Sequence, residues 1–128
     1  MKKKVLIVLS DYYKDISKAL LKSTKKYLNK RTSLKIIKVP GVFEIPVIIS
    51  KNIKKFDGFV AIGCVIKGKT AHFDLISKSV IDAIMNISID NKKPIGNCIL
   101  TCFNYKQAVL RKNKGKEAAF ALNSILYK

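Results

Sequence analysis

The sequence predicts one α/β domain over residues 1–128, in which a parallel sheet of four strands carries helices on both faces. Four segments of strand length, rich in apolar and β-branched residues, occur at residues 5–10, 34–39, 58–66 and 95–101. Segments with apolar residues at helical spacing separate them, and this alternation is typical of a parallel sheet. With 128 residues, 48% of them hydrophobic, the chain is long enough for one such core and too short for two.

The first half of the chain is expected to form a strand, a helix, a second strand and a short helix. Residues 5–10 are almost entirely apolar, as in a central strand that is covered on both faces. Over residues 15–29 apolar positions recur at helical spacing among lysines, which predicts an amphipathic helix. The strand at residues 34–39 ends before a Pro-Gly pair, and residues 44–53 are expected to be helical, with Pro46 tolerated in the first turn.

The second half is expected to continue the alternation. Residues 58–66 form the third strand, and a polar loop over residues 67–70 follows it. The next segment predicts a long helix, because its apolar residues share one helical face: Ile76, Val80, Ala83, Ile84 and Ile87. Residues 95–101 form the fourth strand, and residues 105–110 and 117–127 are expected to be helices.

The formal charge of +18 at pH 7 raises the possibility of an anionic partner such as nucleic acid. Of the 26 basic residues only Arg31 and Arg111 are arginines, and the lysines are dispersed along the chain. Dispersed lysines supply charge without the bidentate base contacts that arginine makes. A generally solvated lysine surface is therefore the preferred interpretation, with a nucleic-acid face as the alternative.

The sequence also predicts a cytoplasmic protein. No apolar stretch approaches the roughly 20 residues that cross a bilayer, and the apolar run after the first lysines is too short for a signal peptide. The cysteines are three in number, and Cys64 and Cys98 lie within apolar strands, as buried thiols do in a reducing compartment. With only one histidine in the chain, a metal site is not expected.

Short segments rich in glycine and polar residues follow all four predicted strands. They begin at Ser10, Pro40, Gly68 and Thr101. In a parallel sheet these segments gather along one edge, where such folds bind ligands. The sequence therefore predicts a binding site at this edge.

The segment after the third strand combines features that suit a phosphate and a proton transfer. Gly68, Lys69 and Thr70 precede a predicted helix, and offer backbone N–H groups, a cation and a hydroxyl at its positive end. The alternative is an ordinary helix cap by Thr70. His72, the only histidine, is a candidate general acid or base, although a lone histidine can also be structural.

The segments after the first two strands offer contacts for a planar, hydroxylated ligand. Tyr12 and Tyr13 can stack on a heterocycle, or can simply cover the sheet edge. Glu44 is one of only two glutamates, and its carboxylate can accept hydrogen bonds from ligand hydroxyls. Its alternative role is a favourable negative charge at a helix N-terminus.

Taken together, in order and spacing, these motifs resemble the lumazine synthase family. The resemblance covers nearly the whole chain and rests on PGVFEIP at residues 40–46, GCVIKGKTAHFD at residues 63–74, and NKGKEAA at residues 113–119. It implies a flavodoxin-like three-layer α/β/α sandwich, and pentamers whose active sites lie between subunits. The implied reaction condenses 5-amino-6-(D-ribitylamino)uracil with 3,4-dihydroxy-2-butanone 4-phosphate to 6,7-dimethyl-8-ribityllumazine in riboflavin biosynthesis. It implies no metal and no organic cofactor.

The resemblance also implies which residues contact the pyrimidine and its ribityl chain. Tyr12 would stack on the ring, and backbone groups at the end of the third strand would hold its edge. The full set is Tyr12, Val42, Phe43, Glu44, Val65, Ile66, Asn97 and, from a neighbouring subunit, Lys114.

For the phosphate, the resemblance implies Lys69 and Thr70 from one subunit and Arg111 from its neighbour, and it implies proton transfer by His72. Only Lys112 separates Arg111 from Asn113, several residues fewer than is usual in the family. A Gly-Asn pair ending at Asn97 also replaces the common aromatic-Gly pair. Two alternatives share the fold: a basic nucleic-acid-binding or shell protein, and a riboflavin synthase paralogue.

Overall fold

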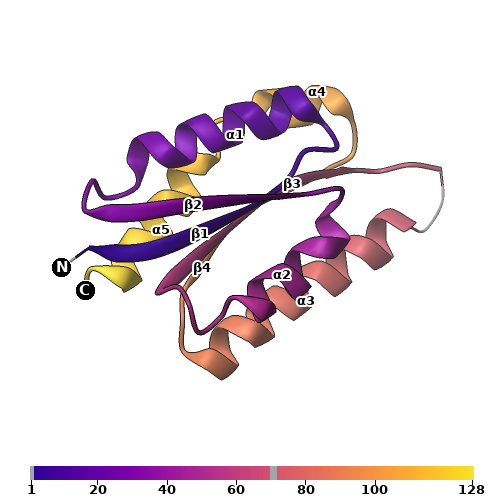
Figure 1. Ribbon diagram of the computed structural model, residues 1–128. Coiled ribbons are helices and arrows are strands. Elements are labelled where there is room, and N and C mark those ends of the chain that lie inside the picture. The colour runs from indigo at the N-terminus through magenta and orange to yellow at the C-terminus, as the bar shows by residue number, and fades with distance from the viewer. Residues whose placement is uncertain (1, 70–71) are drawn as a thin grey trace.

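The computed structural model, shown in Figure 1, describes residues 2–69 and 72–128. Strands and helices alternate along the chain, as the sequence predicts. In chain order the elements are β1 (Lys3–Ser10), α1 (Lys14–Tyr27), β2 (Thr32–Val39), the 3₁₀ helix η1 (Val42–Glu44), α2 (Ile45–Lys51), β3 (Gly58–Ile66), α3 (His72–Asn91), β4 (Ile95–Cys102), α4 (Tyr105–Leu110) and α5 (Gly115–Leu126).

The strands form one parallel sheet in the order β2-β1-β3-β4. The chain moves outward from β1 to β2, crosses back over β1 to β3, and then moves outward to β4. The direction of winding therefore reverses between β1 and β3. Ligands bind in such sheets outside the carboxyl ends of the strands at this reversal.

Strict alternation of side chains along the central strands builds two apolar layers. In β1, Val5, Ile7 and Leu9 lie on the face that α1, α4 and α5 cover, and Leu6 and Val8 lie on the face that α2 and α3 cover. All five side chains are buried, which explains why β1 is apolar from Val5 to Leu9. Figure 1 shows the resulting three layers, and the predicted α/β/α sandwich is confirmed.

The element boundaries differ from the predicted ones mainly at the helices. The helix expected over residues 44–53 ends at Lys51, and a 3₁₀ turn over Val42–Glu44 precedes it. The helix α3 extends well beyond its buried apolar stripe at both ends and stops before Lys92, whose φ of 53° is left-handed. No helix within the described residues combines the length and apolarity that a bilayer crossing requires.

The helices α1 and α5 make an unusually close contact at Gly115. A Cβ atom added to Gly115 would overlap the hydroxyl of Ser23 and the backbone of Leu20 and Thr24. Glycine is therefore required for α5 to begin directly against α1. By contrast, a Cβ added to Gly68 would meet no atom within 4 Å.

We predict that Gly115→Ala lowers the free energy of unfolding by about 1–3 kcal/mol, the usual cost of an overpacked core contact. Two of the overlapping partners are backbone atoms, so a side-chain rotation alone cannot relieve the overlap. Urea denaturation followed by circular dichroism measures the change, and Gly68→Ala is the matched control. Equal stabilities of the two variants would show that α5 is free to shift away from α1.

Candidate active site

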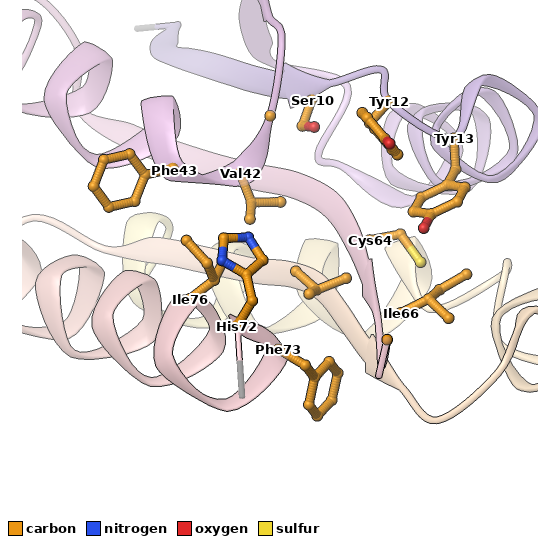
Figure 2. Close-up of a pocket in the computed structure, with 13 residues that line it drawn as sticks. Ser10, Tyr12, Tyr13, Val42, Phe43, Cys64, Ile66, His72, Phe73 and Ile76 are labelled. Carbon is orange, nitrogen blue, oxygen red and sulfur yellow. The ribbon is translucent and has the colours of Figure 1, made fainter. Parts of the chain in front are cut away.

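A cavity of about 380 Å³ opens at the winding reversal of the sheet. Its walls come from the end of β1, the turn after β2, the end of β3 and the first turn of α3. Figure 2 shows the side chains of Tyr12, Val42, Phe43 and His72 arranged around it. The cavity is therefore at the position that the topology predicts for a ligand.

The depth of this cavity depends on Gly63 in β3. A Cβ atom at Gly63 would lie 2.5 Å from Cγ1 of Val42 and 3.3 Å from Cβ of Ser10. Because Gly63 has no side chain, the turn after β2 can rest directly on β3, with Val42 buried between them. The end of β1 forms another wall of the cavity, and a hydrogen bond attaches it to α1. The hydroxyl of Ser17 in α1 donates this bond of 2.5 Å to the Ser10 carbonyl.

Glu44 shapes the turn that carries Val42 and Phe43. Its Oε1 accepts a hydrogen bond of 2.9 Å from the Gly41 N–H, and its own N–H donates to the Gly41 carbonyl at 3.2 Å. This turn-closing role is structural, and it differs from the favourable charge at a helix N-terminus that the sequence offered as the alternative to ligand binding. Glu44 does not line the cavity itself, and a contact between its carboxylate and a ligand stays a prediction.

Aromatic side chains form the rim. The side chain of Tyr12 is 72% exposed and that of Phe43 is 63% exposed. The ring of Tyr13 contacts that of Tyr12 edge to face, with 5.0 Å between the ring centroids. The centroid of the Tyr105 ring lies 6.5 Å from that of Tyr13. Exposed rings at the mouth of an apolar cavity provide faces on which a planar heterocycle can stack.

His72 is the first residue of α3, and its imidazole extends into the space between Val42 and Ile76 (Figure 2). Of the α3 residues that line the cavity, His72 is the one with an ionisable side chain. Val65 and Ile66, half-buried at the end of β3, form the neighbouring wall. Lys69 lies exposed in the segment between β3 and α3, whereas Thr70 falls outside the described residues.

Three predicted site residues lie elsewhere in the same chain. Arg111 and Lys114 line a separate cavity of about 440 Å³, together with Thr101 at the end of β4. Asn97 is exposed on β4, where its Oδ1 accepts a hydrogen bond of 3.0 Å from the N–H of Ile99. One chain therefore does not bring Arg111, Lys114 or Asn97 to the cavity that His72 lines.

Other residues line the cavity without having been assigned a role from the sequence. Phe73 is among them, and its place next to His72 was the available signal. Tyr13, which the sequence offered together with Tyr12 as a stacking residue, also lines the cavity. Cys64 is another; it is buried, as the sequence predicts, and it also forms part of the cavity wall. Burial, and to a smaller extent the neighbouring Cys102, raise the pKa of its thiol to about 12, so the thiol is neutral near pH 7.

Within residues 2–69 and 72–128, no group of three or more His, Cys, Asp and Glu side chains is arranged to hold a metal ion. The absence of a cofactor from the reaction stays a prediction.

The fold and the cavity define a class of protein, an α/β enzyme that binds a small molecule at the winding reversal of its sheet. Comparison with known proteins narrows this class. The sequence model of the 6,7-dimethyl-8-ribityllumazine synthase family matches residues 2–127. The chain is 43% identical to the 6,7-dimethyl-8-ribityllumazine synthase of Bartonella tribocorum, over 94% of this chain and 87% of the relative.

Further relatives carry the same name. Identity is 39% to the protein of Agrobacterium fabrum, over 91% of this chain and 88% of the relative. It is 36% to the protein of Corynebacterium kroppenstedtii, over 92% of this chain and 79% of the relative. The chain belongs to the 6,7-dimethyl-8-ribityllumazine synthase family, which consists of transferases of riboflavin biosynthesis. Membership implies small-molecule substrates and an oligomeric assembly.

The neutral thiol of Cys64 predicts a defined pH dependence of stability. Its pKa rises from 9.0 to about 12 on folding, so the folded chain keeps the proton while the unfolded chain releases it above about pH 9. The stability that this thiol contributes is complete below about pH 9 and falls as the pH rises towards about 12.

We therefore predict that the stability of the wild type relative to Cys64→Ala falls as the pH rises above about 9. Comparing the two proteins at each pH cancels the titration of the lysines and tyrosines that they share. Urea denaturation across this pH range measures the difference in unfolding free energy. A difference that stays constant with pH would contradict the raised pKa.

Proposed function

We propose that the chain condenses 5-amino-6-(D-ribitylamino)uracil with 3,4-dihydroxy-2-butanone 4-phosphate to 6,7-dimethyl-8-ribityllumazine, releasing phosphate and water. The observation that carries this proposal is the convergence of Tyr12, Phe43 and His72 on one cavity at the winding reversal. A planar ring, a hydroxylated chain and a proton-dependent condensation require aromatic faces, polar backbone groups and an acid–base side chain. Tyr12 and Phe43 line the cavity as the aromatic faces and His72 as the acid–base side chain, and we assign the polar contacts to the backbone at the end of β3.

The pyrimidine binds at the aromatic rim of the cavity. Its ring stacks on Tyr12, and Phe43 covers the ribityl end. Backbone groups of Val65 and Ile66 hold the polar edge of the ring, because this end of β3 forms a wall of the cavity. Glu44 acts through the turn that it closes onto Gly41, which fixes Val42 and Phe43 in place.

His72 moves the protons. The 5-amino group attacks the ketone carbonyl, and loss of water gives an imine. Phosphate is then eliminated, the ribitylamino nitrogen closes the ring, and a second water is lost. Each step adds or removes a proton at nitrogen, carbon or oxygen, which His72 can transfer near neutral pH. Holding the two reactants together also lowers the barrier, by about 7–11 kcal/mol in favourable systems.

A neighbouring subunit completes the site. We propose that Arg111 and Lys114 act on the cavity of the next chain in a pentamer, where Arg111 joins Lys69 and Thr70 at the phosphate. Two features support an assembly of this kind. The two cavities lie on different parts of the sheet edge, and α2 and α3 expose large apolar side chains that suit a subunit contact: Val47, Leu75, Met85 and Ile89.

We place this activity in the cytoplasm. Among the described residues Cys64, Cys98 and Cys102 are free thiols. Buried free thiols are typical of proteins that work in a reducing compartment.

We predict that the purified chain forms the lumazine from the two substrates, and that His72→Ala slows turnover by about 10²–10⁴-fold, the usual contribution of an acid–base side chain. Lumazine absorbance measures the rate. The control is Asn86→Ala, which removes an exposed polar side chain of similar size from the same helix. A wild type that forms no lumazine contradicts the function, and an active His72→Ala variant contradicts the role of His72.

We predict that Arg111→Ala raises the Michaelis constant for the ketone phosphate more than that for the pyrimidine, because Arg111 binds the phosphate through charge-assisted hydrogen bonds. The control is Arg31→Ala, at the only other arginine of the chain. Mixing an inactive His72 variant with an inactive Arg111 variant should restore part of the activity after subunit exchange, because one mixed site then has both residues. Absence of any recovery would contradict a site shared between neighbouring subunits.

A further inference from the structure

Four lysines surround a cavity that is separate from the candidate active site. This cavity measures about 570 Å³ and lies between α1 and the start of α5. Lys22 and Lys26 reach it from α1, and Lys112 and Lys116 reach it from the other side. Its remaining lining residues are uncharged: Ala19, Ser23, Tyr27 and Asn113.

No carboxylate within the described residues forms an ion pair with any of these four lysines. None of the four ammonium groups has a carboxylate partner there, and the one salt bridge in residues 2–69 and 72–128 joins Lys78 to Asp82. Glu117 follows Lys116 in sequence and lines the adjacent cavity of Arg111 and Lys114, which Lys116 also borders, but Glu117 does not line this one. Like charges that share one concavity raise its positive potential and favour a bound anion.

The walls of this cavity are held together before any ligand binds. The side chain of Asn123 in α5 donates a hydrogen bond of 2.9 Å to the Tyr27 carbonyl and accepts one of 3.1 Å from the Asn29 N–H. Gly115 sets α5 directly against α1 at the same contact. The two lysine-bearing segments therefore keep a fixed separation, which reduces the cost of ordering them around a ligand.

The aromatic side chains next to these lysines indicate which kind of anion can bind. Tyr27 has the ammonium group of Lys26 at 5.5 Å and that of Lys116 at 5.1 Å from its ring centroid, and Phe120 meets its edge at 5.6 Å between centroids. Because two cations and a neighbouring ring already surround Tyr27, it does not offer an open face to a nucleobase. Recognition here depends on charge rather than on stacking.

We infer that this cavity binds a compact oligophosphate, an anion with three linked phosphate groups, through Lys22, Lys26, Lys112 and Lys116. Its volume falls in the range of sites for small ligands, about 300–1,000 Å³. Lysine suits such a ligand, since each ammonium group is a compact charge that can contact oxygens of adjacent phosphates. This site does not depend on the proposed reaction.

Calorimetric titration with sodium tripolyphosphate at fixed ionic strength tests the site. We expect saturable binding of one anion per chain. The double variant Lys22→Gln/Lys116→Gln should bind at least about tenfold more weakly, because one hydrogen bond to a charged group contributes about one decade in affinity. The matched control is Lys54→Gln/Lys55→Gln, which removes two lysines from another basic cavity, next to β2. The control should keep the affinity of the wild type.

Further measurements distinguish binding at this site from binding at the active site and from nonspecific attraction to the basic surface. Arg111→Ala should weaken tripolyphosphate binding far less than Lys22→Gln/Lys116→Gln does, because Arg111 lines only the adjacent cavity, which shares Asn113 and Lys116 with this one. The same titration with ATP shows whether the site binds a nucleotide or only a free oligophosphate. Binding of either anion that depends on Lys22 and Lys116 supports the site. Equal weakening in both double variants, loss of binding in Arg111→Ala, or absence of saturable binding would overturn it. Single-stranded DNA that binds wild type and the Lys22/Lys116 variant equally, while tripolyphosphate does not bind, would also overturn it.

Discussion

The candidate active site depends on one contact, the close approach of Val42 to Gly63. It brings the turn after β2 onto the end of β3, across the position where the sheet reverses its winding. Phe43 follows Val42 in this turn, and Glu44 closes the turn onto the Gly41 N–H. A side chain at Gly63 would lift the turn and open the space that faces His72. The absence of a side chain at Gly63 therefore determines the shape of the cavity.

Much of the fold followed from the sequence because each strand has a distinct physical signature. Residues buried on both faces of a parallel sheet must be apolar at every position, so β1 and β3 were visible as continuous apolar runs. Helix ends were less well predicted, since they depend on tertiary contacts. The start of α5 at Gly115 is set by α1, and the 3₁₀ turn at Val42–Glu44 is set by β3. Neither contact can be deduced from local spacing.

The site was predictable to the extent that its residues follow strands. Tyr12, Phe43 and His72 all lie in or next to the connections that follow β1, β2 and β3, and the parallel sheet brings these connections together. Cys64 was missed because an apolar residue near a strand end does not reveal whether it faces the core or a cavity. The sequence placed Arg111 in the site only through a family resemblance. In the chain itself Arg111 lines a different cavity, so its role requires a neighbouring subunit.

The most direct test of this account is the turnover of Gly63→Ala compared with the double variant Gly63→Ala/Val42→Ala. We expect Gly63→Ala to slow lumazine formation about a hundredfold with unchanged secondary structure, because a displacement of about 1 Å in a site can have that effect. Removing the methyl groups of Val42 makes room for the new Cβ, so the double variant should be faster than Gly63→Ala alone. Wild-type turnover in Gly63→Ala would contradict the claim that this contact shapes the active site.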